Sequence, residues 1–227
     1  IASVFNPLGF LAPYVLKGKQ ILQDICKQDK DWDTPVEATI LRKWESWVND
    51  LKLLRDVRIP RCLVPKHLCT IKRAELHHFS DASTQGIGQI TYLRIVDEFE
   101  QVHNTLISAK SRVAPSKQVT MPRMELQAAV LSTKMAAFLN RELQIPYISA
   151  EYFWTDSKVV LGYIKNQSRQ FHMYVANRVK QIRDNTLPDQ WFYVPGELNP
   201  ADIASRGSSL CELTRSSWFI GPKFLLD

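Results

Sequence analysis

The order of apolar segments between residues 76 and 143 constrains the fold more than any other feature. Three short segments follow one another, over Leu76–Ser80, Gly88–Val96 and Val102–Ala109, with polar or Gly-containing turns between them. Their pattern predicts three successive strands. The long segment Met121–Leu143 then predicts a helix whose many small residues allow close approach to a sheet.

The second half of the chain continues this alternation. Tyr152–Trp154 predicts a short buried strand, and helices are expected over Ser157–Lys165 and about Phe171–Asp184. A strand over Trp191–Val194 and a short helix from Pro200 follow. We therefore expect an α/β fold with a mixed sheet and flanking helices.

The first part of the chain has a different pattern. Helical spacing is found around Gly18–Lys27 and over Leu41–Leu54, and a basic, Pro-containing connector without a clear period follows. We therefore predict a boundary in this connector. The expected units are a mainly helical segment at 1–60, a linker at 61–73, an α/β domain at 74–207 and a C-terminal tail at 208–227.

Composition excludes several classes of protein. A chain of 227 residues that is 45% hydrophobic and 23% charged is globular rather than disordered. The uncharged segment Ile1–Leu16 is too short and too rich in Pro and Gly to span a membrane, and it lacks the basic region of a signal peptide. We expect no membrane association. Because residue 1 is Ile, we expect a piece of a longer chain.

The cysteines indicate a reducing, intracellular setting. Cys26, Cys62, Cys69 and Cys211 form no C-x-x-C pair and no disulfide framework. The spacing of Cys62 and Cys69 relative to the nearby histidines fits no standard zinc knuckle or ribbon.

Four acidic residues have surroundings that indicate a shared site. Asp81 and Asp156 each follow an aromatic and a hydroxyl residue at the end of a predicted strand, where open α/β sheets form their site crevices. Glu125 lies in the first turn of the Ala-rich helix, and Asp202 lies in the first turn of the last one. Each alone would be explained as a turn former or a helix-start acid. The set together indicates a functional site.

Four carboxylates that meet in one crevice require cations. Two unit charges about 4 Å apart repel by roughly 4 kcal/mol at an effective dielectric of 20. Carboxylate oxygens without Cys or His point to Mg²⁺ or Mn²⁺, and a pair of such ions promotes phosphodiester displacement. We therefore predict a two-ion centre and no small-molecule cofactor, because no Gly-rich phosphate loop, nucleophile elbow or dinucleotide fingerprint is present.

Two basic segments without acids flank these carboxylates. Leu106–Arg123 contains four Lys and Arg residues, and Ser157–Arg183 contains six with aromatic residues between them. Such strips suit a nucleic acid, with cations on its phosphate backbone and bases or sugars on the aromatic rings. A single strip would more often be a solvated helix face, but two acid-free strips around an acid cluster favour nucleic acid. We expect contacts with nucleic acid from several of these residues, among them Arg112, Lys117, Lys158, Arg178 and Lys180.

The motifs around the four acids resemble a known family. FSDAS, PRMEL, FWTDS and NPADIASRG give the order Asp, Glu, Asp, Asp, which resembles the ribonuclease H domain of retroelement reverse transcriptases. The motifs SVFNPLGFLAP, TMPRMELQAAVL and VPGELNPADIASRG resemble most the sequences of the BEL/Pao class of LTR retrotransposons. The resemblance implies a ribonuclease H-like fold, with a five-stranded mixed sheet whose first three strands are antiparallel. Residues 1–60 would be the thumb or connection tail of the reverse transcriptase.

The resemblance also implies an activity and its site. The chain would cut the RNA strand of RNA–DNA hybrids as part of a reverse transcriptase polyprotein, in the cytoplasm within a virus-like particle or in the nucleus. Asp81 would bridge two Mg²⁺ ions, Asp202 would share the first, and Glu125 and Asp156 would complete the second. Many members carry a His in the loop before the last acid. The loop Gly196–Asn199 has none, so turnover would be slower or another group would serve.

Two alternatives stay open. The chain could be a non-catalytic hybrid-binding or scaffold module derived from such an element. It could also be an integrase or transposase, with Asp81, Asp156 and Glu197 as its three acids. That second alternative leaves Glu125 and Asp202 without a purpose.

Overall fold

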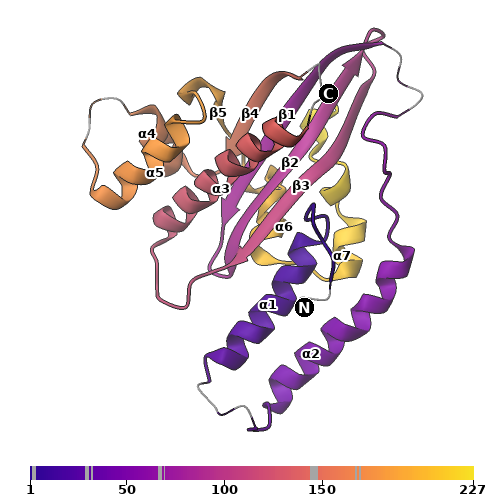
Figure 1. The fold of residues 1–227 in the computed structure, drawn as a ribbon, viewed down its shortest axis with the longest axis vertical. Helices are drawn as coiled ribbons and strands as arrows, with labels where there is room; N and C mark the ends of the chain where they lie inside the picture. Colours follow the sequence, from indigo (N-terminus) through magenta and orange to yellow (C-terminus); the bar gives the residue numbers. More distant parts are fainter. Residues whose placement is uncertain are drawn as a thin grey trace.

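A computed structural model describes the chain except for residues 2–3, 29–30, 32, 66–67, 69, 144–147, 167 and 169. One five-stranded sheet runs through it, with α3 on one face and α6 on the other (Figure 1). The strands are β1 (Ile71–Ala82), β2 (Gly86–Asp97), β3 (Val102–Val113), β4 (Ile148–Thr155) and β5 (Trp191–Tyr193).

The sheet has the order β3-β2-β1-β4-β5. β1, β2 and β3 are paired antiparallel, whereas β4 and β5 are added parallel to β1. This arrangement confirms the mixed five-stranded sheet expected from the sequence. The first three strands are longer than their apolar segments, because each continues through buried polar residues beyond the segment, such as Glu75, Asp97 and Ser111.

Three helices cover one face of the sheet and its β4–β5 side. The longest is α3 (Met121–Glu142), and it packs on β1 and β2 through small buried residues such as Ala128 and Ala129. Pro122 lies in its first turn, where its missing N–H has no partner to lose, and the Thr120 side chain makes no capping hydrogen bond. α4 (Lys158–Lys165) and α5 (Met173–Arg183) pack beside α3.

The opposite face is covered by the C-terminal part of the chain. α6 (Ala201–Arg206) crosses β1 and β2 at very short range, because a Cβ at Gly88 would lie 2.6 Å from the carbonyl oxygen of Ala201. α7 (Leu210–Arg215) follows, and the fully buried Trp218 joins the same core as Phe79 and Tyr92.

The N-terminal helices α1 (Ala12–Cys26) and α2 (Ala38–Asp50) belong to that core as well. A 3₁₀ helix (Leu51–Asp56) continues α2. The indole of Trp47 donates to the carbonyl of Tyr14 at 3.0 Å, and the two rings stack with centroids 5.1 Å apart. The outer edge of β3 is covered, since Ala109 N donates to Leu8 O at 2.9 Å.

The division into units at 1–60, 61–73, 74–207 and 208–227 stays a prediction. β1 begins at Ile71, within the predicted linker, and both terminal segments share a core with the sheet. Among the residues that the structure describes, no helix combines the length and the hydropathy that crossing a membrane requires.

Candidate active site

The parallel pairing of β1 and β4 brings two of the predicted acids together. Ser80 is the register partner of Thr155, so Asp81 and Asp156 follow at neighbouring positions where these strands end. They lie on the same face, because Phe79 and Trp154, two residues earlier in each strand, stack with centroids 5.9 Å apart. The backbone pairing of β1 and β4 therefore places Asp81 and Asp156 side by side.

The other two acids reach this point from helix starts. Glu125 comes just after the first turn of α3 rather than within it as expected, because the helix begins at Met121, and Asp202 lies in the first turn of α6. Asp81 is buried, whereas the other three carboxylates are partly exposed. The structure thus brings together all four acids that the sequence singled out, from four different elements.

Their mutual repulsion is seen in the pKa values. The pKa of Asp81 is raised to about 6. Burial is the main cause, the charges of Asp156 and Asp202 act in the same direction, and a hydrogen bond from Ser205 opposes them. Burial also raises the pKa of Asp156, as do the charges of Glu125 and Asp202. Each of the four carboxylates therefore interacts electrostatically with at least one of the others.

Polar neighbours that the sequence analysis did not single out hold these carboxylates. Ser205 Oγ donates to Asp81, Ser157 Oγ donates to Glu125 Oε2 at 2.6 Å, and Arg206 Nε donates to Asp202 Oδ1 at 2.6 Å. Each partner is close in sequence to one of the acids. Ser157 follows Asp156 directly, and Ser205 and Arg206 come three and four residues after Asp202. This closeness in sequence to the four acids is the signal by which these three partners could have been found.

The loop before α6 closes the site beside Asp156. The side chain of Asn199 lowers the pKa of Asp156, and its Nδ2 donates to Ser80 O at 3.1 Å. A Cβ at Gly196 would lie 3.3 Å from Asp156 Oδ2. Asn199 is thus a further polar group in the loop beside Asp156.

The donor set fits divalent cations in chemistry and charge. It consists of carboxylates alone, the ligands that Mg²⁺ and Mn²⁺ prefer, and cations would relieve the repulsion that raises two of the pKa values. As the side chains stand, no group of three or more His, Cys, Asp or Glu residues in the described ranges is arranged to hold an ion.

Other predicted residues lie elsewhere. Glu197 is exposed in a 3₁₀ helix, and it is not among the charges that act on Asp81 or Asp156. Cys62 is exposed and free, whereas Cys69 and His67 lie outside the described residues.

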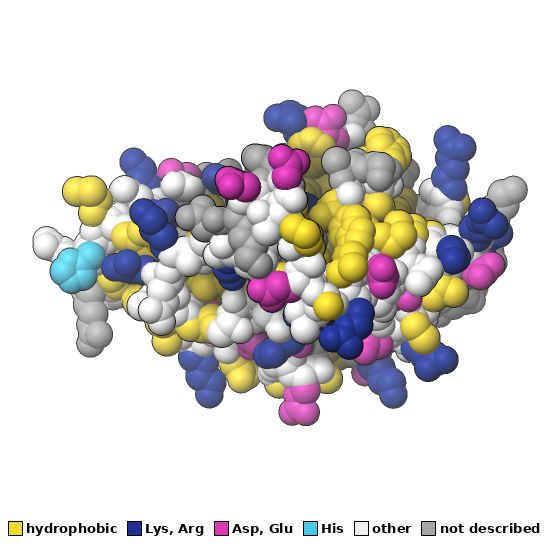
Figure 2. Space-filling view, turned by 90° about the horizontal axis from the view of Figure 1, so that it is seen from below, with side chains coloured by type: hydrophobic (Ala, Val, Ile, Leu, Met, Phe, Trp, Pro, Cys, Tyr) yellow, Lys and Arg dark blue, Asp and Glu magenta, His cyan; other side chains and the backbone are white. Residues whose placement is uncertain are grey.

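The five predicted nucleic-acid contacts are spread over β3, α4, α5 and the loop before α3. Arg112 and Arg178 line one cavity, which is described below. Lys158 lies over the ring of Tyr193, 5.2 Å from its centroid, and Lys117 and Lys180 are exposed. On the face shown in Figure 2, Lys and Arg are interspersed with Asp and Glu rather than gathered in one field. The net charge of +6 is therefore not concentrated on that face.

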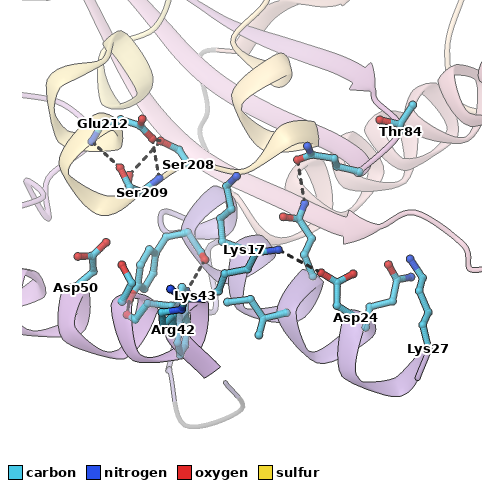
Figure 3. A pocket seen from close by; sticks show the side chains of 17 residues that line it. Lys17, Asp24, Lys27, Arg42, Lys43, Asp50, Thr84, Ser208, Ser209 and Glu212 are labelled. Atoms are coloured by element: carbon cyan, nitrogen blue, oxygen red, sulfur yellow. Dashed lines mark hydrogen bonds and ion pairs between the residues drawn. The ribbon is translucent and has the colours of Figure 1, made fainter. Parts of the chain in front are cut away.

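A larger cleft of about 770 Å³ lies away from the four acids (Figure 3). It is bordered by α1, α2, the β1–β2 turn and the start of α7, and charges of both signs line it. Lys43 Nζ lies 4.0 Å from Asp24 Oδ2, and the carboxylate of Glu212 accepts from Ser209 N at 3.0 Å. Because cations and anions alternate here, we assign no ligand to this cleft.

A comparison with known protein families identifies the family of this chain. The model of the Pao retrotransposon-like RNaseH-like domain matches residues 1–157. The chain belongs to this family. The matched part of this Pao RNaseH-like domain includes the N-terminal helices together with Asp81, Glu125 and Asp156, and it ends before Asp202. No curated protein matches the chain.

Solved structures that resemble this Pao RNaseH-like domain are RNase H proteins. One is the N-terminal RNase H domain of rv2228c from Mycobacterium tuberculosis, with 12% identity, 64% of this chain and 98% of that chain covered, and a TM-score of 0.36. RNase H1 from Halobacterium salinarum has 12% identity, coverage of 57% and 90%, and a TM-score of 0.32. LC11-RNase H1, solved in complex with an RNA/DNA hybrid, has 12% identity, coverage of 57% and 91%, and a TM-score of 0.37.

Proposed function

We propose that this domain hydrolyses the RNA strand of RNA–DNA hybrids with two divalent cations, as part of a reverse transcriptase polyprotein. The observation that carries the proposal is the convergence of Asp81, Glu125, Asp156 and Asp202 from four elements, together with the raised pKa values of two of them. Membership of the Pao RNaseH-like family supports it. We place the activity inside the cell, in the cytoplasm or the nucleus.

The protein side of the reaction follows from the residues. Asp81 would contact both ions, Asp202 would share the first of them, and Glu125 and Asp156 would hold the second. Bound Mg²⁺ or Mn²⁺ ions supply an activated water and stabilise the leaving oxygen. Ser205 keeps Asp81 in place, because its hydroxyl donates a hydrogen bond to this carboxylate, and Asn199 favours the ionised form of Asp156 by lowering its pKa.

The deciding experiment uses a labelled RNA–DNA hybrid with millimolar Mg²⁺, beside double-stranded DNA and double-stranded RNA. We expect cleavage of the RNA strand of the hybrid alone, and loss of cleavage in Asp81→Asn. Asp189→Asn is the matched control, since Asp189 is exposed in a 3₁₀ helix. Full activity in Asp81→Asn would refute the proposed site.

A non-catalytic hybrid-binding module is the second candidate. The observation in its favour is that Ser205, Ser157 and Arg206 already engage three of the carboxylates. Mg²⁺ titration separates the two, because an ion that binds only the folded state raises the unfolding temperature. The nuclease is expected to gain stability with millimolar Mg²⁺, and the inert module is not.

A further inference from the structure

Three cations converge on a cavity that contains no acid. The cavity has a volume of about 340 Å³ and lies at the outer side of α3, between the end of β3 and α5. Its cations come from three elements, Arg112 on β3, Lys134 on α3 and Arg178 on α5. The amide side chains of Gln127 and Gln181 also line it.

The surrounding elements supply no counter-charge. No Asp or Glu occurs between Glu100 and Glu125, between Glu125 and Glu142, or from Ser157 to Arg183. These stretches include β3, the lining part of α3 and all of α5. Among the described residues, none of the three cations forms an ion pair. Like charges gathered without a counter-ion repel, so the cavity favours an anionic ligand.

One of the cations is held in place. The guanidinium of Arg178 stacks 3.5 Å from the ring centroid of Tyr174, and its Nη1 donates to Tyr174 O at 3.2 Å. Gln127 Nε2 donates to the hydroxyl of the same Tyr174, and Arg123 lies over that ring at 4.9 Å. The lining is thus organised before a ligand arrives, which lowers the entropic cost of binding.

The position of the cavity relates it to the acid cluster. Gln127 and Lys134 come two and nine residues after Glu125 on α3. At 1.5 Å per residue, Lys134 lies about 14 Å further along the helix axis. That distance equals about four base-pair steps of 3.4 Å each.

We propose that this cavity holds a backbone phosphate of the bound nucleic acid, a few nucleotides from the bond that is cut. The inference rests on the proposed function for the identity of the nucleic acid. Lys134 is the new member, because it lies outside both basic strips. Gln127 and Gln181 supply neutral donors beside the cations. A phosphate contact fixes register and does not read the sugar.

The test measures binding without catalysis. The Kd for a fluorescent RNA–DNA hybrid is determined in EDTA at several salt concentrations, for the wild type, Arg112→Gln and Lys134→Gln. We expect each variant to raise Kd by roughly threefold to tenfold at low salt, and the double variant to lower the salt slope by about one. Double-stranded DNA should lose affinity to the same extent. Lys223→Gln, which changes an exposed lysine of the C-terminal 3₁₀ helix, is the matched control and should change neither quantity.

Folding is checked on the same variants. Because Arg112 and Lys134 are exposed and repel each other, their neutralisation should leave the unfolding temperature unchanged or raise it. Inorganic phosphate serves as a second probe. If it stabilises the wild type while both variants bind the hybrid normally, the cavity takes free anions and the proposal is wrong.

The outcomes separate this inference from the proposed function. Unchanged Kd and salt slope in both variants would overturn the phosphate site, even if the protein cleaves hybrids. Reduced affinity and slope in a protein that never cleaves would support the phosphate site and refute the nuclease.

Discussion

Ser205 on α6 donates a hydrogen bond from its hydroxyl to the carboxylate of Asp81 on β1, across 124 residues of chain. The carbonyl of the same serine accepts from Ser83 Oγ at 2.9 Å, so α6 is fixed to the end of β1 at two points. A hydrogen bond to a carboxylate favours its ionised form. Ser205 therefore opposes the effects of burial, Asp156 and Asp202 on the pKa of Asp81.

Replacing Ser205 by Ala should make ion binding more sensitive to acid. Without the hydroxyl, the pKa of Asp81 rises above its present value of about 6, and a protonated carboxyl cannot bind an ion. We expect the stabilisation by Mg²⁺ to disappear at a higher pH in Ser205→Ala than in the wild type. The measurement is the unfolding temperature with and without Mg²⁺ between about pH 5 and 8. Ser149→Ala, which removes a hydroxyl bonded to Ala74 O, should not move that limit.

The buried carboxyl of Asp81 should itself reduce stability at neutral pH when no divalent ion is bound. Its pKa rises from 3.8 to about 6 on folding, so between these values the folded protein binds more protons than the unfolded chain. The free energy of unfolding therefore falls as pH rises through this range, and it is lowest above about pH 6. A shift of about two units corresponds to at most about 3 kcal/mol.

Asp81→Asn removes that cost. In EDTA at pH 7 it should raise the free energy of unfolding by about 1 to 3 kcal/mol, and near pH 4 the two proteins should differ little. Urea denaturation at both pH values measures this. A variant that is less stable than the wild type at pH 7 would show that Asp81 is not crowded by the other acids.

The positions of the four acids could be predicted from the sequence because each lies beside a strong local signal. Asp81 and Asp156 end apolar segments, and Glu125 follows Pro122 at a helix start. The extent of β1 could not be predicted, since Lys72, Arg73 and Glu75 interrupt the apolar pattern before Leu76. Glu75 meets its partner on another strand, where Arg94 Nη1 of β2 donates to Glu75 Oε2 at 3.0 Å.

The packing of the N-terminal helices against the sheet could not be predicted from local sequence patterns either. Trp218 Nε1 donates to Phe10 O at 2.8 Å over a separation of 208 residues, and Tyr14 stacks on Trp47. No periodicity within one segment specifies such contacts. The cavity lined by three cations could not be predicted either, because Lys134 comes to lie beside Arg112 and Arg178 only in the folded chain.

Glu75 should stabilise the fold in the opposite pH range from Asp81. Hydrogen bonding with His77 and the nearby Arg94 guanidinium hold the pKa of Glu75 at about 2, below its usual 4.5. Arg94 Nη1 lies 3.0 Å from Glu75 Oε2, and Arg94 Nε donates to Leu225 O at 2.7 Å. A lowered pKa contributes stability above the usual value, and this contribution is lost as pH falls from about 4.5 to about 2.

Glu75→Gln tests this ion pair. At pH 7 it leaves the buried Arg94 without its carboxylate and should lower the free energy of unfolding by about 3 kcal/mol. The difference from the wild type should shrink steadily below about pH 4. Urea denaturation from pH 7 to pH 3 gives the curve, and a difference that is independent of pH would contradict the assignment.

A substitution at Gly9 tests whether the N-terminal segment packs against the sheet as part of one folding unit. Gly9 has a φ of +80°, and a Cβ there would lie 1.6 Å from the carbonyl oxygen of Ala109 on β3. Gly9→Ala therefore combines an unfavourable backbone conformation with a backbone clash, and should cost more than about 2 kcal/mol. Gly162 is the matched control, because it lies within α4 and nothing is within 4 Å of its Cβ position.

Gly162→Ala should raise the free energy of unfolding by about 0.5 to 1 kcal/mol, since alanine favours the helix. If residues 1–60 were a separate tail, Gly9→Ala would leave the unfolding of the sheet unchanged. We expect instead that it lowers the single unfolding transition of the whole chain, because Leu8 and Gly9 lie against the outer edge of β3 and the following residues Phe10 and Leu11 pack on its core. Tryptophan fluorescence and far-ultraviolet circular dichroism should then shift together to lower urea concentration, and separate transitions would argue for an independent N-terminal unit.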